Sequence, residues 1–421
     1  MPFTSFSAAL SALSADTTAI DVVGNNLANL DTTGFKASTV SFQDLVTESL
    51  GAGLSQTQVG FGVGVPLTTR EFTQGALQST GGVDDAAIQG GGFFVLNDPS
   101  QGQLFTRAGN FSVDANGNLL SASGAAVQGW TEVGGVLNTN GPIQNITVPV
   151  GTLQPPVAST QFSASMNLDA AATVGSTAAT FSTPVTVYDS LGTSHVLTLT
   201  FTETAGGTWN YSVSIPGQDL TSGTAGTPTV LTTGTLTFDQ NGNLLTPPAS
   251  AGPIAVTATG LSDGAADLNL NWNLYDSNNQ PLISQFAQNS AVSSVTQNGQ
   301  AAAQLVNVGI GTGGQILANY SNGQQAVVGQ LALASIVNPS SLIAVGDNNF
   351  QASSLTAQPA IGVPDTGGRG EVEGGQLESS TVDIATEFTN LIVYQRGYEA
   401  NAKVVNTADQ LSQDTINLIT T

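Results

Sequence analysis

The amino-terminal stretch TSFSAALSALSADTTAIDVVGNNLANLDTTGFK (residues 4–36) places apolar side chains at alternating three- and four-residue steps. This alternation is the a/d pattern of a coiled-coil helix. We expect the helix to run from about Thr4 to Asn29, because the Asn, Asp and Gly residues that follow favour the turn conformations that end helices. The residues at the a and d steps are Phe6, Ala9, Leu13, Asp16, Ile20, Val23, Leu27 and Leu30.

The carboxy-terminal stretch carries a second stripe of the same kind. Polar groups accompany it, with Arg396 and Glu399 three residues apart and Glu399 and Lys403 four apart, so these groups pair within the helix, cross to neighbouring helices, or do both. One such stripe alone would favour an ordinary buried helix face, whereas two at opposite ends of a β-rich chain favour assembly. The stripe residues are Ile384, Phe388, Leu391, Tyr398, Ala402, Val405, Leu411 and Leu418.

The residues between these helices are typical of strands and turns. Residues 111–120 contain an Asn-Gly hairpin signal between apolar flanks, and the same block recurs at 238–245. We therefore expect a mainly β fold with α-helical termini that pair as a coiled coil, and with nested β domains inserted between them. The predicted strands include 91–96, 104–107, 183–189, 195–202, 209–215, 269–275 and 330–337.

Changes in composition along the chain predict four parts. Residues 1–35 with 372–421 form a terminal helical domain that builds an inner tube, and 36–70 form an extended linker region. Residues 71–150 with 290–371 form an inner β domain, and 151–289 form an outer β domain. Leu153-Gln-Pro-Pro156 predicts the linker into the outer domain, and the stretch from Gly362 to Gly375 predicts a flexible lead into the last helix.

The composition excludes several classes of function. Only 8% of the 421 residues are charged, the net charge is −23, and no Lys or Arg occurs between Ala108 and Gly368, so nucleic-acid binding is excluded. Cysteine is absent. No apolar run reaches the ~20 residues that span a bilayer, so we expect no membrane insertion. The first residues lack the basic and apolar regions of a secretory signal, so we expect no cleaved signal peptide.

No motif predicts an enzyme, a cofactor or a metal site. Gly309-Ile-Gly-Thr-Gly-Gly314 matches a dinucleotide-binding pattern, but the residues after it predict a strand and not the required helix. Asp114–Asn118 and Asp239–Asn243 resemble the start of a calcium loop, yet they lack its acidic twelfth position and read as hairpin turns. His195 is the only histidine, and we expect it to be a half-exposed strand residue.

Three groups of motifs resemble the bacterial flagellar rod-and-hook family. The run from Asn26 to Lys36 resembles its amino-terminal signature, and Gly92-Phe-Phe-Val95 followed by residues 105–111 resembles its β region. Residues 377–383 and the segment from Gln395 to Asn401 resemble its carboxy-terminal motif. The family-motif residues are Asn26, Ala28, Asn29, Gly34, Phe35, Lys36, Gln395, Arg396 and Asn401.

The insertion at 151–289 is similar to that of the hook-forming members, because rod-type members are much shorter. The resemblance implies a structural subunit of the flagellar hook that polymerises with itself into a helical tube and serves as a flexible universal joint. It also implies an extracellular location, export by the flagellar type III apparatus, and contacts with the distal rod protein, the hook cap protein and the hook–filament junction protein. The implied assembly residues are Phe6, Leu13, Ile20, Val23, Leu27, Leu30, Ile384, Phe388, Leu391, Tyr398, Val405, Leu411 and Leu418.

Two alternatives stay open at the level of the sequence. A distal rod-type axial protein that carries an insertion would share both helical ends. An extracellular adhesive or carbohydrate-binding β protein would explain the acidic, turn-rich middle of the chain. It would not need helical ends, and it would bring a secretion signal.

Overall fold

The computed structural model describes residues 2–45, 47–50, 57–133, 136–151 and 153–420. The chain folds as two compact units. The first, here called the helical unit, comprises Met1–Val150, Asn307–Asn319 and Gln325–Thr421. The second, here called the sandwich unit, comprises Gly151–Val306 and Tyr320–Gln324. No helix in the described part of the chain is long and apolar enough to cross a membrane.

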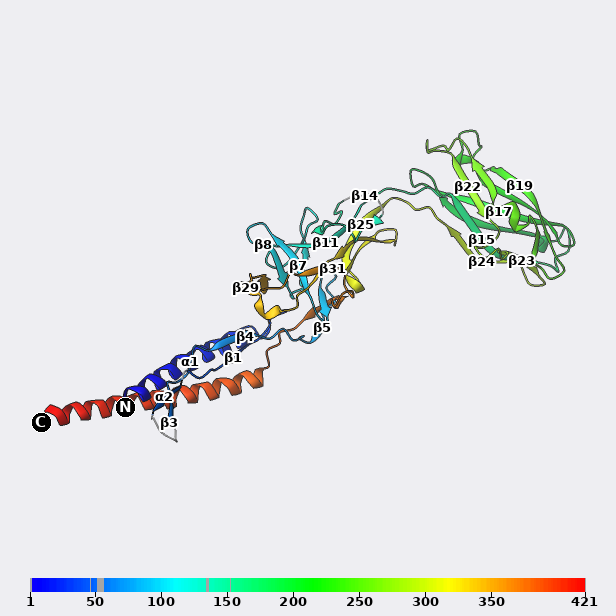
Figure 1. The fold of residues 1–421 in the computed structure, drawn as a ribbon. Coiled ribbons are helices and arrows are strands. Elements are labelled where there is room, and N and C mark those ends of the chain that lie inside the picture. Colours follow the sequence, from blue (N-terminus) through cyan, green and yellow to red (C-terminus); the bar gives the residue numbers. More distant parts are fainter. Residues whose placement is uncertain (1, 46, 51–56, 134–135, 152, 421) are drawn as a thin grey trace. The chain divides into compact units, whose positions relative to one another are not determined.

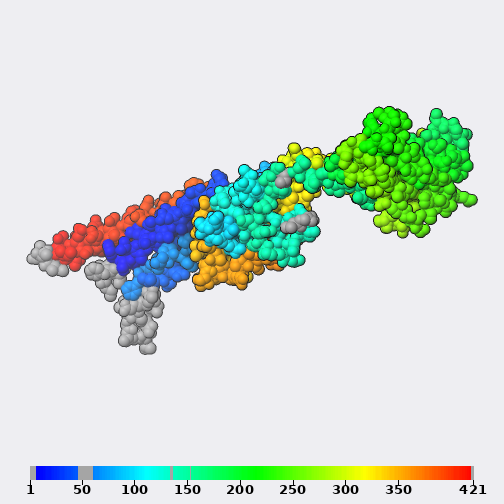
Figure 2. All heavy atoms as spheres, turned by 90° about the horizontal axis from the view of Figure 1, so that it is seen from above, coloured from blue at the N-terminus to red at the C-terminus, as the bar shows by residue number. Residues whose placement is uncertain are grey.

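Two long helices, α1 (Pro2–Ala28) and α2 (Ile384–Thr420), lie side by side in the helical unit (Figure 1). They are antiparallel, because Asp16 bonds Asn401 near the middle of the pair while Asn26 bonds Glu387 at the end of α1. Figure 2 shows the two helices in contact, with α1 in blue and α2 in red. The predicted pairing of the terminal helices is therefore confirmed.

The start of α2 is set by a capping residue. Asp383 precedes the helix, and its Oδ1 accepts a hydrogen bond of 2.7 Å from the backbone N–H of Thr386. A carboxylate at this position satisfies an otherwise unpaired N–H and interacts favourably with the positive end of the helix dipole. The same bond lowers the pKa of Asp383.

A large antiparallel sheet forms the β part of the helical unit. Its strands run in the order β25-β26-β27-β11-β7-β8-β30-β29. Phe93, Phe105, Trp130 and Phe350 belong to a buried apolar cluster on this sheet. The bounds are β25 Ala303–Ile310, β26 Gln315–Tyr320, β27 Gln325–Leu331, β11 Ala126–Val133, β7 Phe93–Asp98, β8 Gly102–Thr106, β30 Asn349–Gln351 and β29 Ile343–Gly346.

Shorter strands complete this unit. The antiparallel pairs β1–β4 and β2–β3 lie within 36–70, so the predicted extended linker contains two strand pairs. The pairs β5–β33 and β6–β32 join residues 77–89 to residues 371–378, where the sequence predicts a flexible lead. The bounds are β1 Ser38–Ser41, β2 Thr47–Leu50, β3 Thr57–Gly60, β4 Leu67–Arg70, β5 Leu77–Ser79, β6 Ala86–Gln89, β9 Ser112–Val113, β10 Leu119–Leu120, β12 Val136–Leu137, β13 Gln144–Asn145, β28 Leu333–Ser335, β31 Ala360–Gly362, β32 Glu371–Gly374 and β33 Gln376–Glu378.

The sandwich unit packs two five-stranded sheets against one apolar core. One sheet has the order β21-β22-β15-β23, with β24 also paired to β15, and the other has the order β16-β17-β18-β19-β20. Trp272 stacks on Phe162 with ring centroids 6.0 Å apart and meets Tyr211 edge-on. The bounds are β14 Leu153–Gln154, β15 Gln161–Asp169, β16 Thr180–Tyr188, β17 Ser194–Ala205, β18 Thr208–Pro216, β19 Pro228–Phe238, β20 Leu244–Thr246, β21 Ile254–Ala258, β22 Leu268–Asn273, β23 Ile283–Phe286 and β24 Ala291–Gln297.

The predicted turns are confirmed where the sequence signal is local. Residues 111–120 form the β9–β10 hairpin, and Asp114 accepts hydrogen bonds from the N–H groups of Asn116 and Asn118. The same Asp-Asn arrangement closes the β19–β20 hairpin at Asp239. The glycine-rich stretch 309–314 spans the end of β25 and the turn before β26, and so a strand follows it, as predicted.

The tightest glycine in the family motifs is Gly109. A Cβ at this position would lie 1.6 Å from the carbonyl oxygen of Ala86. The N–H of Ala86 also donates a hydrogen bond to the carbonyl oxygen of Gly109, so the two backbone segments are held together. We predict that Gly109→Ala destabilises the chain by about 3 kcal/mol or more, because backbone must move to admit the methyl group. Urea unfolding followed by circular dichroism measures the loss.

The matched control is Gly64→Ala, where the nearest atom to a Cβ is 3.6 Å away, an ordinary contact. We expect this variant to lie within about 0.5 kcal/mol of the parent. Equal stability of the two variants would contradict the role assigned to Gly109.

Candidate functional site

Three segments that carry family motifs meet at one buried carboxylate, that of Glu378. Lys36 follows α1, Arg107 follows β8, and Glu378 ends β33. The Lys36 Nζ lies 2.6 Å from Glu378 Oε1, and the Arg107 Nη1 lies 3.3 Å from Glu378 Oε2. The side chains of Lys36 and Glu378 are fully buried, and that of Arg107 is 5% exposed. We call this cluster the charge junction.

Backbone groups add hydrogen bonds to the charge junction, although the buried Nε of Arg107 has no partner among the described residues. Lys36 Nζ also donates to the carbonyl oxygen of Thr73 at 2.5 Å, and Arg107 Nη2 donates to that of Gly90 at 2.8 Å. The Gly75 N–H donates to Glu378 Oε1 at 2.7 Å. Burial lowers the pKa values of both Lys36 and Arg107, and the nearby Glu378 opposes that effect. These hydrogen bonds and ion pairs offset the free-energy cost of burying three charged side chains.

The backbone around Gly34 fixes the approach of the two chain ends. Gly34 has a φ of 68° and donates its N–H to the carbonyl oxygen of Glu378 at 2.7 Å. A Cβ there would lie 2.7 Å from the backbone of Arg107, so only glycine fits. The adjacent Phe35 packs with Val382 in a small buried cluster, which Leu30 covers. This local geometry explains the Gly34-Phe35-Lys36 motif.

Asn26 holds the end of α1 against two other elements. Its Oδ1 accepts the N–H of Ser38 at 3.0 Å, and its Nδ2 donates to the Ser38 carbonyl at 2.8 Å and to Glu387 Oε1 at 3.0 Å. The pKa of Glu387 is raised by burial, and the bond from Asn26 counters part of that rise. By contrast, Asn29 bonds only locally, to the Asn25 carbonyl and Thr32, and Ala28 is exposed.

The carboxy-terminal motif residues divide between the helix seam and the surface. Asn401 is half-buried and donates to Asp16 Oδ2 at 3.0 Å. Gln395 and Arg396 are exposed on α2. Among the described residues, no ion pair within 4.0 Å joins Arg396, Glu399 and Lys403, so of the two predicted alternatives the contact within the helix does not form.

Small residues occupy the seam between the helices. Gly397 faces Asp16, and a Cβ on it would lie 3.3 Å from the Asp16 carboxylate, so a larger residue would push the helices apart. The buried positions of α1 are Ala9, Ala15, Ala19, Val23 and Asn26. The buried or half-buried positions of α2 are Glu387, Asn390, Leu391, Tyr394, Gly397, Asn401, Ala402, Val405, Ala408 and Ser412.

The large apolar residues of the predicted stripe are divided between buried, half-buried and exposed positions. Within the single chain, Val23 is buried, while Leu13, Ile20, Leu27, Leu30, Leu391 and Val405 are half-buried. The exposed members are Phe6, Ile384, Phe388, Tyr398, Leu411 and Leu418. Within the single chain the stripe is therefore only partly buried, and six of its large apolar members stay exposed.

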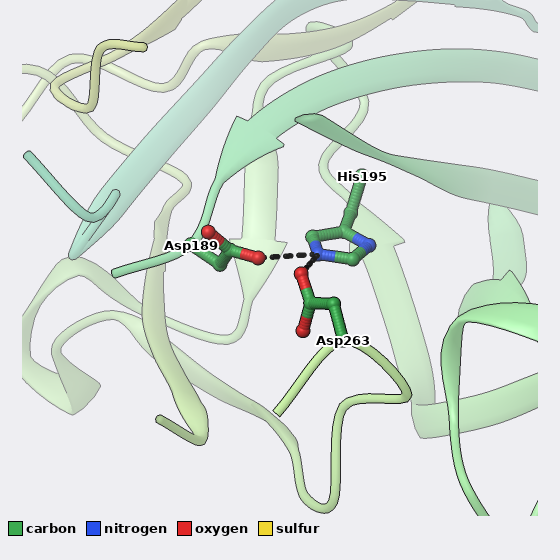
Figure 3. A group of neighbouring side chains, drawn as sticks. All are labelled: Asp189, His195 and Asp263. Atoms are coloured by element: carbon green, nitrogen blue, oxygen red, sulfur yellow. Dashed lines mark hydrogen bonds and ion pairs between the residues drawn. The ribbon is translucent and has the colours of Figure 1, made fainter. Parts of the chain in front are cut away.

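The sandwich unit holds a second buried polar cluster, around His195 (Figure 3). His195 lies on β17 as predicted, but it is only 4% exposed, so the expectation of a half-exposed side chain is wrong. Two carboxylates compensate the burial of the imidazole by hydrogen bonding. Its Nδ1 lies 3.0 Å from Asp219 Oδ2, and its Nε2 lies 3.0 Å from Asp189 Oδ2. Asp189 is near in sequence, whereas Asp219 is brought in by the fold and carries no local signal.

The charge junction yields a test of buried ion pairing. We predict that Glu378→Gln destabilises the chain by about 3–5 kcal/mol, because it leaves Lys36 and Arg107 buried without their counter-charge. Urea unfolding measures the change, with the exposed Glu371→Gln as the matched control. Adding Lys36→Met to Glu378→Gln should cost less than the sum of the two single changes. Additive losses would show that the three groups do not act together.

Models of flagellar families match the chain in four places. The flagella basal body rod protein model matches residues 6–36, and the flagellar hook protein FlgE/F/G D1 domain model matches 87–164. The flagellar basal body protein FlaE D2 domain model matches 167–300, and the flagellar basal body rod FlgEFG protein C-terminal model matches 373–418. The matched ranges cover both helices, the charge junction and most of the sandwich unit.

Full-length relatives agree with these models. The chain is 34% identical to the flagellar hook protein FlgE of Salmonella typhimurium, over 98% of this chain and 100% of that protein. It is 33% identical to the hook protein of Borreliella burgdorferi, over 97% of this chain and 98% of that protein. The solved structure of Helicobacter pylori FlgE2 shares the fold, with a TM-score of 0.51 at 16% identity over 70% of this chain and 99% of that one. The chain therefore belongs to the flagellar hook protein FlgE family and is a structural subunit of the bacterial flagellar hook.

Proposed function

We propose that the paired terminal helices are the polymerising core of the hook subunit, and that their exposed apolar side chains bind neighbouring copies. This proposal rests on the exposure of large apolar residues on the two helices, whose contact with each other is made by other side chains. Phe388 is 52% exposed, Leu411 58% and Leu418 79%. Exposed apolar groups gathered on one element mark a surface that another molecule covers.

The chemistry of the seam supports this division of roles. Alanine and glycine at Ala15, Ala19 and Gly397 let the two helix backbones approach closely, so that little of the apolar surface is used within one chain. The pairs Asp16–Asn401 and Asn26–Glu387 fix the register of the helices. The remaining stripe, with Ile384 and Tyr398, then faces outward at helical spacing, as coiled-coil knobs require.

Contacts of this kind lead to a tube. A surface on one helix pair that binds a different surface on the next copy is a heterologous contact, and such contacts repeat without closing. The exposed Arg396, Glu399 and Lys403 are free to cross to a neighbouring copy, the second alternative drawn from the sequence. We propose that these ionic groups set the stagger between copies, while the apolar stripe supplies the affinity.

The sandwich unit is proposed to be the part that slides when the hook bends. It contains eight carboxylates and no Lys or Arg, and it is rich in Thr, Ser, Asn and Gln. Surfaces of one sign with few ion pairs bind one another weakly, which suits subunits that must shift as a universal joint turns. In the proposed arrangement the inner tube comprises 1–35 with 372–421, the inner β domain 71–150 with 290–371, and the outer β domain 151–289.

The remaining partners are also proposals that rest on membership of the family. They are the distal rod protein below the hook, the hook cap protein at its growing end and the hook–filament junction protein above it. Export through the flagellar type III apparatus without a cleaved signal peptide belongs to the same proposal.

The apolar stripe gives a direct test. We predict that Phe388→Ser with Ile392→Ser changes the stability of the monomer by no more than about 1 kcal/mol, because both side chains are exposed. The same double variant should abolish hook assembly, since it removes apolar area from the contact between copies. Urea unfolding measures the first effect, and electron microscopy of basal bodies the second.

The matched control is Asn406→Ser, an exposed polar position on the same helix, which should assemble normally. Normal hooks from the Phe388 and Ile392 double variant would contradict the proposed contact. A double variant that loses several kcal/mol would instead place these side chains within the monomer's own core.

The proposed role of the sandwich unit has its own test. We predict that deleting residues 151–306 and joining the cut ends by a short glycine-serine linker leaves tube assembly intact and changes its curvature. The reason is that the helices and the charge junction lie wholly in the other unit. Electron microscopy of the hooks measures both properties. If the deleted chain folds, as judged by circular dichroism, but forms no tube, the assembly contacts are not confined to the helical unit.

A further inference from the structure

One end of the sandwich unit gathers nitrogen and carboxylate groups that the proposed hook function does not use. Three separate turns supply them: Asp189 follows β16, Asp219 ends a short 3-10 helix (η2, Gly217–Asp219), and Asp263 lies between β21 and β22. His195, at the start of β17, lies between them. The sequence predicts no metal site here, because only the fold brings Asp219 and Asp263 to His195.

Two carboxylates face the same imidazole nitrogen. His195 Nε2 lies 3.0 Å from Asp189 Oδ2 and 4.0 Å from Asp263 Oδ2, and these three atoms lie within 4.8 Å of one another. Figure 3 shows both side chains directed at that one nitrogen. A single N–H can point at only one oxygen, so a proton on Nε2 leaves the other carboxylate without a partner of opposite charge.

The other ring nitrogen is held as it is in metal-binding histidines. Asp219 Oδ2 lies 3.0 Å from His195 Nδ1. A carboxylate there accepts the Nδ1–H, which directs the lone pair of Nε2 toward Asp189 and Asp263, and this carboxylate–histidine arrangement is the usual support of a metal-ligating imidazole. Asp219 is thus a positioning residue, and the three groups beyond it are the ligand set.

Charge balance points to a cation from outside the chain. Three carboxylates surround a single imidazole, and the sandwich unit has no Lys or Arg that could compensate them. Asp189 is fully buried, whereas the side chain of Asp263 is 26% exposed, which leaves a path to solvent. Even a protonated His195 supplies only one positive charge to these three carboxylates, of which Asp189 is fully buried, and a divalent ion would offset the remaining negative charge.

The turns are fixed in place by backbone bonds. The Ser262 N–H donates to the Asp219 carbonyl at 2.9 Å, and the Thr221 N–H donates to the Gly260 carbonyl at 2.9 Å. Asp189 uses its other oxygen, Oδ1, to accept the N–H groups of Leu191 and Thr193, which leaves Oδ2 facing His195 Nε2. The ligands are therefore presented by a rigid framework.

We propose that Asp189, His195 and Asp263 bind one divalent transition-metal ion of the Zn²⁺ class, which ties two turns and the start of β17 together at one end of the sandwich. Ligands at about 2.0–2.2 Å from zinc lie roughly 3–3.5 Å from one another, so closing this site needs only a small shift of the exposed Asp263 turn. Mixed imidazole and carboxylate donors favour Zn²⁺ over Mg²⁺ and Ca²⁺, which prefer sites built entirely from oxygen. The site is independent of the proposed assembly role of the helices.

Calorimetric titration of the untagged full chain with Zn²⁺ tests the proposal. We expect one ion per chain, and binding at least tenfold weaker in His195→Gln and in Asp263→Asn. Asp239→Asn is the matched control, because Asp239 makes the same kind of turn as Asp189 but lies outside the cluster, and it should bind as the parent does. Equal affinities in all four proteins would mean that Zn²⁺ binds other acidic groups, and would overturn the proposal.

A second measurement does not depend on variants. His195 is the only histidine, so ¹⁵N-histidine labelling gives a single imidazole in the NMR spectrum. We expect one equivalent of Zn²⁺ to shift the Nε2 resonance while Nδ1 keeps its proton. Zn²⁺ should also raise the unfolding temperature of the sandwich unit by several degrees, as read from the fluorescence of its buried Trp209 and Trp272. An Nε2 resonance unchanged by excess Zn²⁺ would show that His195 serves only as an ion-pair partner of Asp189 and Asp219.

Discussion

The buried contact of Glu378 with Lys36 and Arg107 is the constraint on which the helical unit depends. It joins residues 342 positions apart in the sequence, and so it holds the segment after α1 to the segment before α2. Replacing buried ion pairs by apolar groups often leaves stability unchanged, so their value lies more in specifying one arrangement than in adding free energy. Here the specified arrangement is the meeting of three family motifs, each of which contributes one charge.

Polar pairs also specify the contact between α1 and α2, although these pairs are weaker than the ion pairs of the charge junction. Asp16 with Asn401 and Asn26 with Glu387 are polar pairs within a contact otherwise built from alanine and glycine. Shifting one helix by a turn would separate both pairs and bury their polar groups without partners, which costs more than the lost bonds alone. Small residues in the seam also leave several larger apolar side chains exposed, and this exposure is the basis of the contacts proposed between copies.

Much of this architecture can be predicted from the sequence, and the exceptions have physical causes. Local signals, such as the Asn-Gly hairpin at 111–120 and the heptad spacing of both ends, predict the right elements because they depend on neighbours in the chain. The heptad pattern does not say which of its positions meet the other helix of the same chain, since a helix with small residues on one face and large ones on the next has the same periodicity. Phe388 is exposed in the single chain, whereas Gly397 lies against Asp16 in the seam.

The partners that meet in the charge junction and in the His195 cluster cannot be predicted from neighbouring residues in the sequence either. Lys36 stands in a recognisable motif, but nothing near it in the sequence identifies Glu378 or Arg107 as its partners. A global signal does exist, because a chain with only six basic residues rarely uses two of them in one buried site without a structural reason. The confinement of those six residues to the terminal parts agrees with the proposed roles of the two units, because sandwich units that all carry negative charge repel one another weakly. The histidine cluster fits this division, because a site that neutralises carboxylates inside one sandwich stabilises that unit without joining it to its neighbours.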